Sequence, residues 1–154
     1  MSGPWFRVGG ALLLTLSPAL WADDGAPPVR TALIPGTTKT VVVAEGQLEP
    51  RSTGSYSLRV YAGSNPRFPY DRFLAGVVRA RDGSVVDVRF SDLERAGEPD
   101  IVVIIRSAGT GGYISADAFR LDTGVLSLIG AVSGLPATED PVLALKARIE
   151  GAAK

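Results

Sequence analysis

The side chains best placed for chemistry are hydroxyls in and around a glycine-rich segment, RSAGTGGYISADAF, at residues 106–119. Ser107 or Ser115 could act as a nucleophile, but a serine needs a base beside it. The chain has no histidine, and its lysines lie far from both serines in the sequence. The sequence therefore disfavours a hydrolase, and any enzyme mechanism would have to use carboxylates, lysine or tyrosine.

The same segment could also cradle a phosphate group. A phosphate-binding loop of the P-loop type places Lys and then Ser or Thr after its glycines and continues into a helix. Here Tyr113 follows the glycines, and the next residues have the pattern of a strand. We therefore set the phosphate-binding interpretation aside.

A second chemical candidate is the acidic connection that carries Asp92, Glu94, Glu98 and Asp100. Its spacing is similar to that of a calcium loop of the D-x-D-x-D-G type. Ala96 occupies the third ligand position, and Val103 stands where such a loop has its bidentate glutamate. Cysteine and histidine, which zinc prefers, are absent from the chain. We predict no metal site and no cofactor.

The glycine-rich segment then has two remaining interpretations. A tight hairpin needs only about two turn residues, whereas three glycines fall within residues 109–112, soon after the apolar run Ile101–Ile105. The segment could be a recognition loop that ends in Tyr113, or a connection whose tyrosine merely packs. The residues alone leave both interpretations open.

The first 22 residues have the layout of a secretory signal peptide. Arg7 precedes an apolar stretch, Val8–Leu16, and Pro18 and Ala22 follow it, so we expect cleavage after Ala22. The stretch is shorter than the roughly 20 residues of a membrane span, and an N-terminal anchor is the alternative. Without Arg7 the formal charge becomes 15 − 16 = −1, which argues against nucleic-acid binding. The lack of cysteine in an exported chain favours the bacterial periplasm.

After the signal peptide we expect a loosely ordered segment, 23–39, which is rich in Pro, Gly and Thr, and then a single domain, 40–154. TVVVAEG, which ends at Gly46, predicts a strand, and YSLRVYA alternates apolar and polar residues as a half-buried strand does. Pro66 and Pro69 make the next stretch a loop, because proline cannot donate to a sheet.

The second half of the domain predicts further strands. Turn signals at Arg81-Asp82-Gly83 and Asp122-Thr123-Gly124 predict two hairpins. The run IVVII is apolar on both faces, so we expect a covered, central strand. Ile114, Ala116 and Ala118 should share one face of the strand that follows the glycines.

The C-terminal residues change from the period of a strand to that of a helix. Asp140 suits a helix N-cap, and the proline after it suits the first turn. Val142, Leu145 and Ile149 follow at spacings of three and four, and Gly151 should end the helix. The whole pattern predicts an all-β fold: an antiparallel β-sandwich, or flattened barrel, with one short C-terminal α-helix.

Three stretches, together with the signal peptide, resemble the family of periplasmic inhibitors of invertebrate-type (i-type) lysozyme. They are SLRVYAG, FPYDRFLAGVVRARDGSV and FSDLERAGEPDIVVIIRSAGTGGYISADAF, and the resemblance covers most of residues 41–128. It implies a periplasmic, non-enzymatic protein whose partner is i-type lysozyme, and a homodimer is a further implication. Two alternatives stay open: a structural or adhesive envelope domain, with or without calcium, and an inhibitor of chicken-type lysozyme, of a kind that often carries cysteines.

Inhibitors of this family carry a Ser-Gly-x-Tyr loop that enters the active-site cleft of lysozyme. In this chain threonine replaces the serine of that motif, at Thr110, and the tyrosine is Tyr113. Lysozymes use paired carboxyl groups, to which the two hydroxyls could donate hydrogen bonds while the glycines keep the loop narrow. The resemblance thus implies these lysozyme-binding residues: Ser107, Gly109, Thr110, Gly111, Gly112 and Tyr113.

Overall fold

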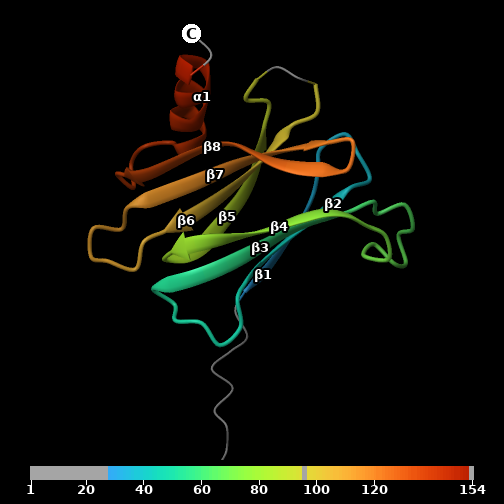
Figure 1. Ribbon diagram of the computed structural model, residues 1–154, viewed down its shortest axis with the longest axis horizontal. Coiled ribbons are helices and arrows are strands. Elements are labelled where there is room, and N and C mark those ends of the chain that lie inside the picture. Colours follow the sequence, from blue (N-terminus) through green and yellow to red (C-terminus); the bar gives the residue numbers. More distant parts are fainter. Residues whose placement is uncertain (1–27, 95–96, 153–154) are drawn as a thin grey trace, which may run out of the picture.

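The computed structural model describes residues 28–94 and 97–152, and the expected signal peptide lies outside them. Two four-stranded antiparallel sheets stack into a sandwich (Figure 1). Sheet A contains, in spatial order, β1 (Val29–Leu33), β2 (Thr40–Glu45), β3 (Thr53–Tyr61) and β4 (Phe73–Asp82). Sheet B contains β5 (Ser84–Ser91), β6 (Asp100–Arg106), β7 (Ile114–Asp122) and β8 (Val125–Leu135), and is followed by the helix α1 (Pro141–Ala152). The predicted sandwich with one C-terminal helix is confirmed, and the two sheets do not close into a barrel.

The main core lies between the sheets and is built from alternate residues of their strands. Tyr56, Leu58 and Val60 of β3 are fully buried there, as their period-two pattern predicts. They share this core with the inward residues of β6 and with Phe119 of β7. Burial of apolar surface between the two sheets is therefore what fixes the sandwich.

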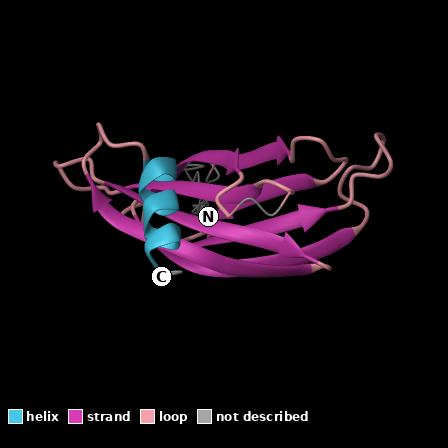
Figure 2. Cartoon of the chain, turned by 90° about the horizontal axis from the view of Figure 1, so that it is seen from above, coloured by secondary structure: helices cyan, strands magenta, loops and turns pink. Residues whose placement is uncertain are grey.

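The helix covers the outer face of sheet B and makes a second, smaller core (Figure 2). Leu145 and Ile149 are buried in it, and a Cβ on Gly130 of β8 would lie 3.0 Å from the Ile149 side chain. Val142 N donates to the Asp140 carboxylate at 2.9 Å, which confirms the N-cap, and the helix ends one residue later than predicted. Covered by sheet A and by α1, β6 is central and buried, as predicted. No helix in the described part of the chain is long and apolar enough to span a membrane.

One of the two predicted hairpins is wrong. The hairpin at residues 122–124 joins β7 to β8 as expected, but β4 pairs with β3 whereas β5 pairs with β6. Residues 81–83 therefore carry the chain from one sheet to the other. Gly83 has a φ of 111° and donates its N–H to Ser52 O at 2.7 Å. The turn signal at residues 81–83 correctly predicts that the chain changes direction there. Which strands pair afterwards depends on contacts between residues distant in sequence.

Two further details differ from the sequence-based expectations. The segment 23–39 was expected to be loosely ordered, yet β1 lies within it and pairs with β2 from Val29↔Ala44 to Leu33↔Thr40. The signal at Pro35-Gly36 marks the turn after β1. The alternation after Gly83 predicts that Val86, Val88 and Phe90 share one face of β5. A bulge between Val85 and Asp87 changes this alternation, so that Val86 packs toward the helix while Val88 and Phe90 pack against the main core.

Candidate functional site

The glycine-rich segment forms a closed loop, 107–113, between β6 and β7 at one end of the sandwich (Figure 1). Ser107 N donates to Tyr113 O at 2.9 Å, which ties the two ends of the loop together. Gly112 N donates to Gly109 O at 3.2 Å and closes a tight turn at the tip. Gly112 has a φ of 56°, a conformation that favours glycine. The loop therefore has a defined shape held by its own backbone.

The hydroxyl side chains of the loop face solvent. Thr110 is exposed, and Tyr113 is 53% exposed although it is a large aromatic residue. A Cβ on Gly111 would lie 2.4 Å from the Tyr113 ring, so the ring rests directly on the backbone of that glycine. Neither hydroxyl has a hydrogen-bond partner among the described residues. Both hydroxyls are therefore exposed and could donate a hydrogen bond to a partner molecule.

A shallow hollow of about 610 Å³ lies beside this loop. It is lined mainly by polar residues from several elements: Ser52, Asp82, Ser107, Tyr113, Ser115 and Ser133. The structure thus brings the two candidate nucleophiles, Ser107 and Ser115, to the same place. Among the described residues, no lysine lines this hollow.

The acidic connection lies at the opposite end of the sandwich, and its carboxylates are committed to partners there. Asp100 is buried and accepts hydrogen bonds from Leu93 N and Arg120 Nε, both at 3.0 Å. Arg120 also pairs with Glu94. Burial raises the pKa of Asp100 above its ordinary value of 3.8, and the hydrogen bonds from Leu93 and Arg120 oppose that rise.

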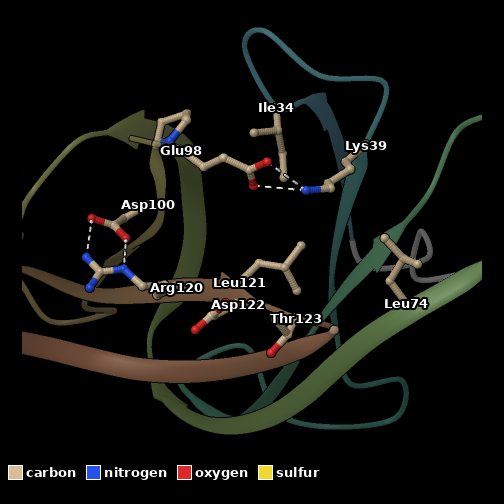
Figure 3. Close-up of a pocket in the computed structure, with 11 residues that line it drawn as sticks. Ile34, Lys39, Leu74, Glu98, Asp100, Arg120, Leu121, Asp122 and Thr123 are labelled. Carbon is tan, nitrogen blue, oxygen red and sulfur yellow. Dashed lines mark hydrogen bonds and ion pairs between the residues drawn. The ribbon is translucent and has the colours of Figure 1, made fainter. Parts of the chain in front are cut away.

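Glu98, from the same connection, pairs instead with Lys39 at 2.9 Å across a hollow of about 580 Å³ (Figure 3). Figure 3 shows Asp100 and Arg120 facing each other in the same hollow. The described residues contain no group of three or more acidic side chains that could hold a metal ion. Glu94, Glu98 and Asp100 of the acidic connection form these ion pairs.

A hydrogen bond between a buried tyrosine and a buried aspartate stabilises the fold. Tyr56 Oη donates to Asp117 Oδ2 at 2.6 Å, and Arg79 Nε lies 3.5 Å from the same oxygen. Burial, and then the hydrogen bond to Asp117, raise the pKa of Tyr56. A neutral tyrosine that donates to a carboxylate satisfies both groups inside the core. This pair stabilises the sandwich and is not exposed for catalysis.

Three residues that sequence reasoning missed lie directly behind the loop. Arg81 and Glu45 are buried and paired, and Gly83 contacts the loop base. The sequence did contain a sign that Arg81 is buried. Arg81 continues the inward alternation of β4, at a position where an apolar residue is expected. The turn signal of residues 81–83 predicts a hairpin turn at Arg81 instead.

Comparison with known proteins agrees with the fold. The family model for the periplasmic lysozyme inhibitor of I-type lysozyme matches residues 28–149. The crystal structure of PliI-Ah, such an inhibitor from Aeromonas hydrophila, is 42% identical, has a TM-score of 0.71, and the match covers 77% of this chain and 98% of that one. The structure of A. hydrophila PliI in complex with Meretrix lusoria lysozyme is 44% identical, has a TM-score of 0.72, and the match covers 77% and 95%. A search of curated protein sequences gave no match.

These similarities extend over both sheets and the helix. The family match begins at residue 28, so it includes β1, and it ends at residue 149, inside α1. The chain belongs to the family of periplasmic inhibitors of i-type lysozyme.

Proposed function

We propose that this protein inhibits i-type lysozyme by placing the loop 107–113 in the active-site cleft of the enzyme. The observation that carries the proposal is the pair of exposed hydroxyls, on Thr110 and Tyr113, on a narrow loop whose ends are closed by the Ser107–Tyr113 hydrogen bond. The solved A. hydrophila relative in complex with M. lusoria lysozyme supports the choice of partner.

The chemistry of the target matches these groups. Lysozymes use one protonated and one ionised carboxyl group on either side of the scissile bond. A hydroxyl can donate a hydrogen bond to an ionised carboxyl group, and hydrogen bonds to charged groups contribute about 1.5–3 kcal/mol each. The loop would also occupy the space that the polysaccharide needs. Inhibition would thus require no chemical step by this chain.

Threonine at position 110 is compatible with this role. Its hydroxyl is retained relative to the serine of the family motif, and the side chain is exposed at the loop tip. The added methyl group restricts the rotation of the side chain. We propose that the substitution changes the strength of inhibition but not its mechanism.

The direct test is inhibition of purified i-type and chicken-type lysozymes by the mature chain, 23–154. We expect i-type lysozyme to be inhibited at lower concentrations of the protein. The same preparation, assayed alone on ester, glycoside and peptide substrates, should show no turnover. Absence of inhibition of both enzymes would reject the proposal. A rise in melting temperature on adding calcium would then favour an adhesive envelope domain.

A further inference from the structure

A buried arginine stands at the end of the sandwich that carries the loop. Arg81, near the end of β4, is only 5% exposed. Its guanidinium donates hydrogen bonds to four main-chain oxygens, those of Pro50, Arg51, Ser55 and Gly83. A guanidinium has five donors in a rigid, planar arrangement, so one side chain can fix several backbone segments at once. Arg81 thus joins the segment before β3 to the crossover, residues 81–83, which carries the chain from sheet A to sheet B.

A buried glutamate completes this arrangement from β2. Glu45 Oε2 lies 3.4 Å from Arg81 Nη2, and Glu45 Oε1 accepts a hydrogen bond from Val85 N at 2.7 Å. Arg81 and Val85 lie on either side of Gly83, the residue at which the chain passes between the sheets. The Glu45 carboxylate therefore holds both sides of the crossover.

The crossover is in direct contact with the base of the loop. A Cβ on Gly83 would lie 1.9 Å from Arg106 O and 2.7 Å from Ser107 Cα. These are backbone atoms, which cannot move aside as a flexible side chain can. Ser107 is also the residue whose N–H closes the loop on Tyr113. A displacement of Gly83 would therefore be transmitted to the loop closure.

We propose that Glu45, Arg81 and Gly83 are positioning residues that fix the base of the loop 107–113 and so preorganise it for lysozyme. This inference rests on the proposed function. A buried ion pair is by itself weak evidence for stability, because desolvation offsets the attraction. Its contribution here is geometric: the pair holds the backbone beneath a glycine-rich loop, and a preorganised loop loses less conformational entropy on binding.

The test compares two glycine substitutions that differ in what surrounds them. Gly83→Ala adds a methyl group against the loop base. Gly124→Ala, in the β7–β8 turn at the far end, is the matched control: Gly124 also has a positive φ, of 81°, but no atom lies within 4 Å of its added Cβ. We expect Gly83→Ala to speed hydrogen exchange at residues 107–113 and to weaken inhibition about tenfold, a loss of about 1.4 kcal/mol. Gly124→Ala should change neither.

Two additional variants separate positioning from folding. Arg81→Lys keeps the charge but loses the planar set of donors, so loop exchange and inhibition should change in the same direction as in Gly83→Ala. In a Gly83→Ala, Tyr113→Ala double variant the losses of inhibition should not add, because both act through one loop. All assays are made well below the melting temperature of each variant.

The outcomes are distinguishable. If the hydrogen-exchange rates at residues 107–113 are unchanged in both Gly83→Ala and Arg81→Lys, the inference is overturned, regardless of the result of the lysozyme assay. Faster loop exchange without weaker inhibition, in a protein whose parent inhibits, would also overturn it. A parent that inhibits no lysozyme would reject the proposed function, and the exchange measurements would still decide whether these residues hold the loop.

Discussion

Each end of the sandwich contains a buried ion pair, but the two ends differ in what they present to solvent around it. At the end that carries the loop 107–113, Glu45 and Arg81 form a buried pair behind the backbone, and within the loop the neutral hydroxyls of Thr110 and Tyr113 face solvent. At the far end, which carries the 92–100 connection, the charged side chains pair with one another: buried Asp100 and Glu94 with Arg120, and Glu98 with Lys39. A binding loop needs unpaired groups on a fixed base, and the loop 107–113 has both.

The largest expected effect comes from breaking the buried pair at the far end. Arg120→Met leaves the buried Asp100 carboxylate without its cation. Removal of one partner of a buried pair costs about 3–5 kcal/mol, and we expect the lower value because the Arg120 side chain is 25% exposed. Chemical denaturation measures this loss, and inhibition by the folded protein should stay unchanged.

The control for that variant is Lys39→Met, which breaks the more exposed pair with Glu98. Exposed pairs contribute about 0–1 kcal/mol, so little stability should be lost. Weaker inhibition by folded Arg120→Met protein would contradict the comparison, since it would place the far end in the binding surface.

At the loop end, Tyr113→Ala should weaken inhibition and leave stability nearly unchanged. Truncation of an aromatic hot spot costs roughly 2 kcal/mol, or some 30-fold in affinity. The matched control is Tyr70→Ala: Tyr70 is 50% exposed, close to the 53% of Tyr113, but lies in the loop between β3 and β4. Titration of i-type lysozyme activity with each variant compares their strengths of inhibition. Equal inhibition by the two variants would show that the contact lies elsewhere.

A smaller effect is expected at the loop tip. Thr110→Ala removes one hydroxyl contact and a methyl group, so we expect a loss of about 1–2 kcal/mol in binding. Thr110→Ser restores the residue of the family motif and should preserve or improve inhibition. The pair of variants separates the hydroxyl from the methyl group in the same lysozyme titration. If Thr110→Ala and the parent inhibit equally, the hydroxyl does not bind the enzyme.

The same contrast explains what the sequence could and could not predict. Features that depend on neighbouring residues were predictable: the alternation at Tyr56–Val60, the N-cap at Asp140 and a connection at the glycine-rich segment before the next strand. The crossover at Gly83 was not, because a turn signal does not specify the strand that pairs next. The buried role of Arg81 was missed for the same reason, since its partners come from three segments distant in sequence.

The smallest prediction concerns the pH dependence of stability at the loop end. The Glu49 carboxylate accepts hydrogen bonds from the main-chain N–H and the hydroxyl of Ser55, and Arg81 lies 3.8 Å away. The bonds from Ser55, and more weakly Arg81, hold the pKa of Glu49 below its ordinary value of 4.5. Because the folded-state pKa is depressed, Glu49 stabilises the fold above its ordinary pKa, and this contribution is lost as the pH falls through the lowered value.

Glu49→Gln has the same shape but does not titrate. The melting temperature of the parent should therefore exceed that of Glu49→Gln by its largest margin near neutral pH. The margin should shrink as the pH falls below the ordinary value of 4.5 and through the lowered pKa of Glu49, where the carboxylate becomes protonated. Taking the difference between the two proteins at each pH cancels the opposite contribution of Asp100, whose pKa is raised by burial at the far end. A margin that stays constant from neutral to acidic pH would show that the Glu49 charge does not help to hold the segment before β3.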